Sequence, residues 1–376
     1  MKILVLNAGS SSLKFTLFET TLEAIETNSD RALARGIVER VSSMADALKA
    51  VFEQLGDDTV EAVGHRVVHG GDLLYKSTII DEAVEREIEA LSVLAPLHNP
   101  HNLEAYRAAK SRLPGIPQVA VFDTAFHHTL PPRAYIYGLP WEYLTEKKIR
   151  RYGFHGISHR YVSWRFAQLH GRNPTDYRLI TCHLGNGCSM CAIEYGRSID
   201  TSMGFTPLEG LIMGTRAGDV DAGATLHLLT LGVLSPDLLL QVLNSASGLK
   251  GISGISNDMR DLLQAAEQGN ERAALAIDAF CYRVRKYIGT YLAAMNGADA
   301  LIFTAGIGEN SPAIRARICE GLSNLGISLD PAANERDNHE AREIGHSKVP
   351  VWVVPTDEEL LIAQDTLRCI LNVPHQ

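Results

Sequence analysis

Short apolar runs alternate along this chain with glycine-rich breaks and with longer stretches of helical periodicity. The first run, residues 3–6, stops at Asn7, and an apolar run resumes at Leu13 after Ala-Gly-Ser-Ser-Ser. Small residues between two strand-like runs predict a β-hairpin that turns at Asn7–Ser12. Residues 60–68 and 117–122 are short and apolar, which is typical of buried strands.

The design of the first hairpin recurs near the middle of the chain. Residues 178–193 contain an apolar run, a break at Gly185–Gly187 and a second apolar run. Two hairpins of one design indicate a duplicated domain. Because any hairpin favours glycine and asparagine in its turn, two unrelated hairpins are the alternative.

Two stretches have the periodicity of helices. Residues 271–295 carry apolar side chains at three- and four-residue steps, which is the pattern of a long amphipathic helix. Residues 158–169 are expected to form a helix with Ser158 as its N-cap and Gly171 just beyond its end.

Strands and helices alternate again near residue 300. A strand at 300–303 is followed by a glycine-rich turn at 305–310. Ser311 and Pro312 then have the residue types of an N-cap and a first helical position. This alternation predicts an α/β architecture.

Length and charge narrow the class of protein. The chain has 376 residues, which fits two domains, and its net charge of −9 argues against a general nucleic-acid or membrane surface. No apolar run is long enough to cross a bilayer, and the first residues do not resemble a signal peptide. Six irregularly spaced cysteines favour a reducing, cytoplasmic location. The Cys188–Cys191 pair lies in an expected strand without a second pair, which favours a structural role.

Three strand-ending glycine turns are candidates for binding phosphate. The first carries hydroxyl groups and is followed by Lys14, whose charge can neutralise a phosphate. The other two are residues 183–187 and 306–310, the last of which is expected to lead into a helix N-terminus. Neither a Walker A loop nor a G-x-G-x-x-G fingerprint occurs in the sequence. Each turn alone could be an ordinary tight turn, but three together suggest a nucleotide site.

Several charged side chains have surroundings suited to an anionic ligand. Arg66, Arg216 and His155 lie among glycines that allow a ligand to approach the backbone. Each of these residues alone would more often be structural or a surface charge. His155 and His159 form an H-x-x-x-H, but a helix that starts at Ser158 would not place both on one face, so a metal pair is not expected.

Two carboxylates follow predicted strands. Asp123 comes after residues 119–122, and Glu358 comes after residues 351–354. Either could hold Mg²⁺ through oxygen. The alternative is a helix N-cap or an acidic residue in a first helical turn.

Several motifs of the chain, taken together, resemble those of a known family. The sequence resembles the acetate kinases, which belong to the superfamily of acetate and sugar kinases, Hsp70 and actin. The motifs are NAGSSSLKF at 7–15, GHRVVHGG at 64–71, PLHNP at 96–100, VFDTAFHHTLP at 121–131, RYGFHGISHRYV at 151–162, HLGNG at 183–187, DTSMGFTPLEGLIMGTRAGDVD at 200–221, GIGEN at 306–310 and DEELLIA at 357–363.

The resemblance implies a fold and a domain arrangement. The expected fold is α/β, a two-domain duplicated ribonuclease H-like fold of the actin, Hsp70 and sugar kinase type, with the active site in the interdomain cleft. The expected domains are 1–124 plus 359–376, and 125–358. A homodimer is also implied.

The resemblance further implies a reaction, its cofactor and its residues. ATP and acetate would be converted reversibly to ADP and acetyl phosphate, with Mg²⁺ or alternatively Mn²⁺. Catalytic residues would be Asp123, His155 and Arg216, and metal ligands would be Asn7 and Glu358. The acetate site would comprise Arg66, Val68, Leu97, Phe154 and Pro207. The nucleotide site would comprise Lys14, His183, Leu184, Gly185, Asn186, Gly187, Asp258, Met259, Arg260, Gly306, Ile307, Gly308, Glu309 and Asn310.

General chemistry agrees with these roles. A carboxylic acid with a pKa of about 4–5 is already ionised at pH 7, so the attacking group needs no general base. It does need its charge offset as it nears an anionic phosphate, which Arg66 can do. Arg216 and His155 can meet the charge that spreads over the transferring group. We therefore interpret Asp123 as an orienting or metal-linked group more than a proton acceptor.

The sequence departs from the family pattern at four places. The segment between Lys14 and Arg66 is short, Asp357 stands where asparagine is usual, Met259 replaces a phenylalanine of the adenine site, and Ala222 replaces a proline. These departures bear on nucleotide preference and local stability. They leave every residue with a chemical role in place.

The sequence leaves two alternative functions. A propionate kinase or another short-chain fatty acid kinase is the close alternative, because one methylene in an apolar pocket contributes only about 1–3 kcal/mol of discrimination. A more remote alternative is an ATP-hydrolysing switch protein on the same fold. Such a protein would attack with water and would have no use for Arg66. Small-molecule substrates, and neither nucleic acid nor membrane, are the expected partners.

Overall fold

The protein consists of two compact units. The computed structural model describes residues 1–9, 12–40, 43–96, 98–336 and 339–374. Unit 1 comprises Met1–His128, Phe154–Tyr161 and Asp357–Gln376, and unit 2 comprises Thr129–Gly153 and Val162–Thr356. These units differ from the expected domains chiefly in assigning Phe154–Tyr161 and Glu358 to unit 1.

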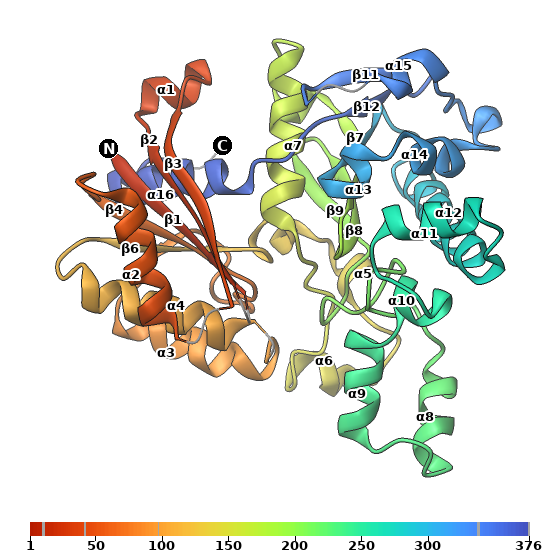
Figure 1. Ribbon diagram of the computed structural model, residues 1–376, viewed down its shortest axis with the longest axis horizontal. Helices are drawn as coiled ribbons and strands as arrows, with labels where there is room; N and C mark the ends of the chain where they lie inside the picture. The colour runs from red at the N-terminus through yellow and green to blue at the C-terminus, as the bar shows by residue number, and fades with distance from the viewer. Residues whose placement is uncertain (10–11, 41–42, 97, 337–338, 375–376) are drawn as a thin grey trace. The chain divides into compact units, whose positions relative to one another are not determined.

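Unit 1 is built on a six-stranded mixed sheet with the order β3-β2-β1-β4-β6-β5. Its strands are β1 (Lys2–Ala8), β2 (Ser12–Glu19), β3 (Arg31–Glu39), β4 (Ala62–Val67), β5 (Thr78–Ile79) and β6 (Gln118–Phe122). β1, β4 and β6 run parallel, whereas β2, β3 and β5 pair antiparallel with their neighbours. The carboxyl ends of the three parallel strands therefore meet at one edge of the sheet (Figure 1).

Unit 2 repeats this sheet. Its strands are β7 (Arg178–Leu184), β8 (Cys188–Glu194), β9 (Arg197–Thr201), β10 (Ala300–Thr304), β11 (Arg342–Gly345) and β12 (Val351–Val353). They have the order β11-β12-β10-β7-β8-β9, with β7, β10 and β12 parallel and the others antiparallel. Strand order and direction match those of unit 1 throughout, which confirms the duplication predicted from the two hairpins.

Helices cover both faces of the first sheet. They are α1 (Leu22–Thr27), α2 (Met44–Leu55), α3 (Glu82–Ala90), α4 (Asn99–Arg112) and α16 (Glu358–Leu371). Leu4, Leu6 and Phe15 form a buried cluster with α2 and α4. α16 packs against β1, β4 and β6 (Figure 1). A Cβ at Gly64 of β4 would collide with Thr366 of α16, so glycine allows this close approach.

The helices of unit 2 are more numerous. They are α5 (Pro132–Tyr135), α6 (Trp141–Thr145), α8 (Ala222–Thr230), α9 (Pro236–Ser245), α10 (Gly248–Ser253), α11 (Met259–Glu267), α12 (Glu271–Ala294), α13 (Ala305–Asn310), α14 (Pro312–Cys319) and α15 (Pro331–Glu335). α12 is the long amphipathic helix predicted at 271–295, and its buried residues include Phe280 and Ile288. α7 (Gly156–Leu169) begins in unit 1 and continues in unit 2, where Phe166 contacts Trp352 of β12 edge-to-face.

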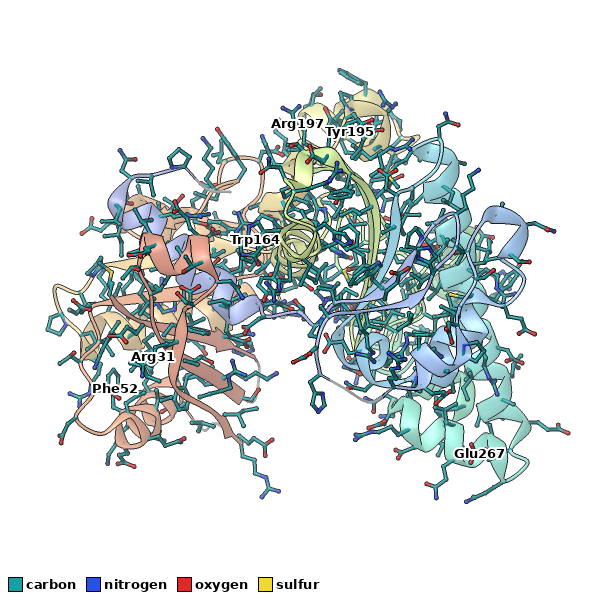
Figure 2. The ribbon with its side chains drawn as sticks, turned by 90° about the horizontal axis from the view of Figure 1, so that it is seen from above. Arg31, Phe52, Trp164, Tyr195, Arg197 and Glu267 are labelled. Atoms are coloured by element: carbon teal, nitrogen blue, oxygen red, sulfur yellow. The ribbon has the colours of Figure 1, made fainter. Side chains whose placement is uncertain are left out.

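Short 3₁₀ turns complete the chain, at Leu91–Val93, Ala125–Thr129, Pro174–Asp176 and Ser323–Leu325. Arg31 and Phe52, two side chains of unit 1 that Figure 2 labels, each contact a residue of a neighbouring element. Arg31 on the edge strand β3 lies 3.4 Å from Glu19 on β2. The guanidinium of Arg112 on α4 lies 5.2 Å from the ring of Phe52 on α2. Within the described residues, no helix is both long and apolar enough to span a membrane.

Three local predictions were wrong at their boundaries. The helix expected from Ser158 begins at Gly156, whose N–H donates to the Asp123 carbonyl at 2.9 Å, so Ser158 is buried inside the helix and is not its cap. Residues 306–310 belong to helix α13 and do not form a turn. β1 continues to Ala8, so Asn7 is a strand residue; the expected turn includes residues 10 and 11, which lie outside the described part.

Candidate active site

The carboxyl edge of the first sheet gathers the polar residues that the sequence singled out. Arg66 lies near the end of β4, and Asp123 directly follows β6. Asn7 lies near the end of β1. The pairing of Leu6 with His65 places Asn7 beside Arg66 in the parallel register. Their proximity follows from strand order, because parallel strands end at the same edge.

Arg66 holds Asp123 in a two-point ion pair. Its Nε donates to Oδ1 at 3.0 Å, and its Nη2 donates to Oδ2 at 2.6 Å. Nη1 donates to Asn7 Oδ1 at 3.4 Å. Asp123 is buried with 1% side-chain exposure, whereas Arg66 remains 21% exposed. A guanidinium has five N–H groups, so these three bonds leave one N–H on each Nη for a further acceptor.

Glu358 approaches the same guanidinium from α16. It is the first residue of the helix, and Asp357 is the N-cap that accepts from the Leu360 N–H at 3.0 Å. Glu358 Oε2 lies 3.8 Å from Arg66 Nε, and it is buried without a hydrogen-bond partner among the described residues. Burial raises the pKa of Glu358 to about 7; Arg66 opposes the increase and Asp123 adds to it. A carboxylate oxygen of this kind has unsatisfied capacity for a cation.

The donor set suits Mg²⁺. No cluster of three or more His, Cys, Asp or Glu side chains suited to a metal occurs within the described ranges. Mg²⁺ does not need one, because it is usually held by one or two protein oxygens together with substrate phosphates and water. The buried Glu358 oxygen and the Asn7 amide oxygen have the chemistry for that kind of site.

Lys14 and His155 belong to the same unit. Lys14 on β2 pairs with Asn7 across the hairpin, and its charge lowers the pKa of Glu358. His155 has a left-handed backbone, with φ of +56°, and is 9% exposed. The bond from the Gly156 N–H to the Asp123 carbonyl fixes its backbone next to Asp123. The structure therefore gathers Asn7, Lys14, Arg66, Asp123, His155 and Glu358 in unit 1.

The residues predicted to surround the acetate methyl group belong to different units. Val68 and Phe154 are buried in unit 1. The Val68 N–H donates to Asn102 Oδ1 at 3.2 Å, and the Phe154 ring meets His69 edge-on at 5.5 Å. Leu97 lies outside the described residues, and Pro207 belongs to unit 2.

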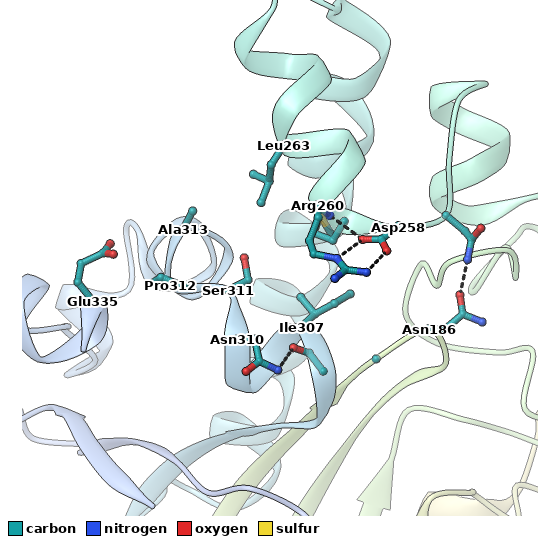
Figure 3. Close-up of a pocket in the computed structure, with 14 residues that line it drawn as sticks. Asn186, Asp258, Arg260, Leu263, Ile307, Asn310, Ser311, Pro312, Ala313 and Glu335 are labelled. Atoms are coloured by element: carbon teal, nitrogen blue, oxygen red, sulfur yellow. Dashed lines mark hydrogen bonds and ion pairs between the residues drawn. The ribbon is translucent and has the colours of Figure 1, made fainter. Parts of the chain in front are cut away.

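Unit 2 contains a cavity of about 600 Å³. A cavity of this size can hold a nucleotide-sized ligand. It is lined by Gly185, Asn186, Asn257, Asp258, Met259, Arg260, Leu263, Gly306, Ile307, Asn310, Ser311, Pro312, Ala313 and Glu335 (Figure 3). Eight of the fourteen residues predicted for a nucleotide therefore surround one space, although they come from three distant segments of the chain.

Polar contacts organise this cavity. Arg260 pairs with Asp258 through Nε–Oδ1 at 3.0 Å and Nη2–Oδ2 at 2.6 Å, and the bond from Arg260 lowers the pKa of Asp258 (Figure 3). Asn257 Nδ2 donates to Asn186 Oδ1 at 3.0 Å. Met259 is 4% exposed and supplies apolar surface at the position where the family pattern has phenylalanine.

The other predicted nucleotide residues lie elsewhere. Lys14 is in unit 1, and His183, Leu184, Gly187, Gly308 and Glu309 are absent from the described lining of the cavity. Leu184 is fully buried at the end of β7. Glu309 Oε1 accepts from the N–H groups of Ala305 and Thr356, at 2.7 and 3.1 Å, so its carboxylate fastens local backbone. Contact of these residues with a nucleotide stays a prediction.

Arg216 lies in the long segment between β9 and α8. Its Nη1 donates to the Pro207 carbonyl at 2.7 Å. Backbone bonds fix the chain around it, from Met213 N–H to the Arg216 carbonyl at 3.1 Å and from Gly214 N–H to the Asn186 carbonyl at 2.9 Å. Arg216 is thus connected to the turn that contributes Asn186 to the cavity.

Sequence reasoning missed several residues of the cavity. Asn257 directly precedes the predicted Asp258, so its neighbour was a usable signal. Leu263 lies one helical turn after Met259 on α11, which a helical projection would have suggested. Glu335 lies at the end of α15, and no local pattern connects it with the other segments.

The repeated sheet and these two groups of residues define the class of the protein. It has the duplicated ribonuclease H-like α/β fold, found in the superfamily of acetate and sugar kinases, Hsp70 and actin. A family model described as the acetokinase family matches residues 39–364. The chain belongs to the acetokinase family.

Curated relatives and solved structures agree with this assignment. The acetate kinase of Chloroherpeton thalassium is 48% identical over 99% of this chain and 100% of its own length, and that of Dictyoglomus turgidum is 47% identical over 98% of each. The crystal structure of Porphyromonas gingivalis acetate kinase matches with a TM-score of 0.90 and 41% identity, covering 98% of this chain and 99% of that one. A propionate kinase from Francisella tularensis gives 0.90 and 39%, covering 99% and 100%.

Proposed function

We propose that the protein is an acetate kinase, which transfers the terminal phosphoryl group of ATP reversibly to acetate. The observation that carries the proposal is the partly exposed guanidinium of Arg66, which Asp123 holds while one N–H on each Nη is left for a further acceptor. The names of the curated acetate kinase relatives support the same reaction.

The acceptor carboxylate binds to Arg66. A planar guanidinium with two free N–H groups matches the two oxygens of a carboxylate. Acetate is ionised at neutral pH, so its oxygen attacks phosphorus without a general base. Arg66 offsets the repulsion between the carboxylate and the phosphate and holds the attacking oxygen in place.

Asp123 orients Arg66. Its two short bonds to the guanidinium occupy both carboxylate oxygens, so Asp123 is an acceptor of fixed hydrogen bonds in an otherwise buried position. This arrangement supports the interpretation of Asp123 as an orienting group and not as a base. The ion pair determines which N–H groups of Arg66 face the substrate.

Asn7 and Glu358 are the proposed ligands of Mg²⁺, with Mn²⁺ as an alternative. When bound, the ion neutralises phosphate charge and helps to orient the phosphates of ATP. The protein's own contribution is the buried, unpartnered Glu358 oxygen and the Asn7 amide oxygen, both near Arg66.

The cavity of unit 2 is the proposed site of ATP and ADP. Met259, Leu263 and Ile307 supply apolar surface for the nucleoside, and Gly185 and Gly306 allow close approach of backbone. His155 and Arg216 are proposed to stabilise the charge that develops on the transferring phosphoryl group.

Propionate is the alternative acceptor. Val68, Leu97, Phe154 and Pro207 are proposed to surround the methyl group, and one more methylene would change the selectivity only modestly. The likeness to the Francisella propionate kinase structure is the observation that keeps this alternative.

A cytoplasmic homodimer is the proposed state. All six cysteines are free thiols, which is typical of a reducing compartment. Leu226, Leu231 and Leu240 are 61%, 63% and 54% exposed on and beside α8 and α9, and such apolar side chains are common at contacts between copies. Sedimentation of the purified protein would measure the assembly.

Steady-state turnover tests the function. The purified protein is assayed with Mg·ATP and acetate, propionate or butyrate, with water alone as the control. The highest kcat/KM with acetate supports the proposal. A higher kcat/KM with propionate or butyrate would identify that acid as the acceptor in place of acetate. If ATP is turned over no faster with any acid than with water, the protein is not a carboxylate kinase.

A further inference from the structure

The long segment 202–218 carries Pro207 and Arg216, and a polar network outside the proposed catalytic residues organises it. Glu209 is at the centre of the network. Its Oε1 accepts from Arg151 Nη2 at 2.6 Å, and its Oε2 accepts from the Tyr137 hydroxyl at 2.5 Å. Both carboxylate oxygens are thus occupied by donors from the segment before α7.

The same two donors also hold the backbone of the segment. Arg151 Nη1 donates to the carbonyl oxygens of Thr201, Ser202 and Met203 at 2.9, 3.1 and 3.0 Å. The hydroxyl of Tyr137 accepts from the Phe205 N–H at 2.8 Å. Arg151 and Tyr137 therefore bind the segment on both sides of Gly204.

Gly204 fits inside this network because it has no side chain. A Cβ at this position would collide with Glu209 Oε2 and with the Tyr137 hydroxyl. The N–H groups of Tyr152 and Gly153 donate to the Gly204 carbonyl at 3.0 and 3.2 Å. The chain thus wraps closely around the Glu209 carboxylate.

The network around Glu209 is connected to the Arg216 side chain through the Pro207 carbonyl. The Arg216 carbonyl accepts from the Met213 N–H, and the neighbouring N–H groups of Gly214 and Ala217 donate to the carbonyls of Asn186 and Leu243. The side chain of Arg216 donates through Nη1 to the Pro207 carbonyl at 2.7 Å. Pro207 lies two residues before Glu209, so the place of that carbonyl depends on where the Glu209 side chain is held.

We propose that Glu209, fixed by Arg151 and Tyr137, is a positioning residue that aims the Arg216 guanidinium at the transferring phosphoryl group. The inference rests on the proposed function, and it adds a residue for which no chemical role had been assigned. Glu209 has to be charged because it accepts hydrogen bonds through both oxygens. One donor is the Arg151 guanidinium, and the other is the Tyr137 hydroxyl, which itself accepts from the Phe205 N–H. Neutralising Glu209 weakens its bond to Arg151, shifts the Pro207 carbonyl and displaces the Arg216 guanidinium.

The test is a double-mutant cycle between Glu209→Gln and Arg216→Ala. We expect Glu209→Gln alone to lower kcat by about 10- to 100-fold, the effect of a displacement of about 1 Å at a reacting centre. We expect the KM for ATP to stay within about twofold. In the Arg216→Ala background, Glu209→Gln is expected to cause no further loss, because there is no guanidinium left to aim. A purely structural role would not produce this loss of effect.

One more variant and a control complete the design. Tyr137→Phe removes the hydroxyl that binds Glu209 and accepts from the Phe205 N–H, and it keeps the bonds of Arg151. It serves if Glu209→Gln does not fold, and it is expected to give the same non-additivity with Arg216→Ala. Asp299→Asn is the matched control, because it neutralises a carboxylate of unit 2 that binds Arg178 at 3.4 Å away from the segment. It should leave kcat unchanged.

Distinct results overturn the inference and the function. Multiplicative effects of Glu209→Gln and Arg216→Ala, or wild-type kcat in the folded Glu209→Gln or Tyr137→Phe protein, would overturn the positioning role while the wild type still phosphorylates acetate. A wild-type protein that phosphorylates no carboxylate rejects the proposed function before any variant is compared.

Discussion

Arg66 and Asp123 meet through two parallel hydrogen bonds, Nε to Oδ1 at 3.0 Å and Nη2 to Oδ2 at 2.6 Å, at the end of neighbouring parallel strands. The carboxylate is buried and the guanidinium is partly exposed. The buried Asp123 carboxylate therefore fixes the orientation of the Arg66 guanidinium. A substrate can bind Arg66 without contacting Asp123.

Replacing Asp123 tests this orientation. Asp123→Asn keeps the size of the side chain but removes the charge and places an amide N–H group against the guanidinium. We expect kcat to fall by about 100-fold or more, and the buried ion pair to lose about 3–5 kcal/mol of unfolding free energy. Turnover and urea unfolding would be measured together. Asp58→Asn is the control, because its ion pair with Lys2 at 2.7 Å is partly open to solvent and should contribute little to stability. Turnover near that of the wild type would refute the orienting role.

Arg66→Lys separates charge from geometry. Lysine keeps the positive charge but cannot bind Asp123 and a carboxylate each through two bonds. We expect the KM for acetate to rise by about tenfold or more while the KM for ATP changes by less than about twofold. Initial rates over a matrix of both substrate concentrations would measure this. Equal increases in both KM values would contradict an acceptor site at Arg66.

Glu358→Gln is expected to uncouple stability from activity. Burial raises the pKa of Glu358 to about 7, so the charged form is disfavoured in the protein without a cation. Glutamine removes this cost, and the melting temperature without Mg²⁺ should stay the same or increase. The Mg²⁺ concentration for half-maximal turnover should rise by about tenfold. Activity titrations with Mg²⁺ and thermal melts would check both parts. An unchanged Mg²⁺ requirement would argue against Glu358 as a ligand.

Met259→Phe restores the aromatic residue that the family pattern has at the nucleotide cavity. Stacking of a base on an aromatic ring contributes about 1–3 kcal/mol, so we expect the KM for ATP to fall severalfold. The KM for acetate should not change. A companion variant, Leu325→Phe, adds an aromatic ring at a half-exposed position that does not line the cavity and should leave both values unchanged. A higher KM for ATP in Met259→Phe would mean that the cavity is already filled at this position.

We expect the folded protein to lose stability in mild acid because of the buried side chain of His65. Its Nε2 lies 2.7 Å from Gln118 Oε1 in the core, and burial lowers the pKa of His65 to about 4. The unfolded chain takes up a proton near pH 6.5 and the folded protein only near pH 4, so stability falls as the pH drops through this window. At pH 5 this amounts to about 2 kcal/mol relative to pH 7.

The measurement is urea unfolding at pH 7 and pH 5. His65→Gln removes the titrating group, so the variant should lose less stability between the two values than the wild type. His339→Gln serves as control, because His339 is exposed and solvated. An unchanged pH dependence in His65→Gln would show that His65 is not responsible.

The sequence by itself determined the elements and the type of site residues. Strands at 62–67 and 118–122, the hairpin turn at Gly185–Gly187 and the long helix α12 depend on local patterns, because alternation, glycine placement and helical periodicity act over a few residues. The resemblance carried by Arg66 and Asp123 pointed to the right family for the same reason: short motifs preserve local chemistry.

Only the tertiary structure decided how these residues meet. Glu309 was expected at the nucleotide; its carboxylate accepts from the backbone N–H groups of Ala305 and Thr356, and its contact with a nucleotide stays a prediction. Glu335 lines the cavity, and Glu209 lies at the centre of a hydrogen-bond network with Arg151 and Tyr137. Apart from the bond between Ala305 and Glu309 within α13, these contacts join segments far apart in the chain. Long-range contacts depend on strand order and packing, which no single stretch of sequence specifies.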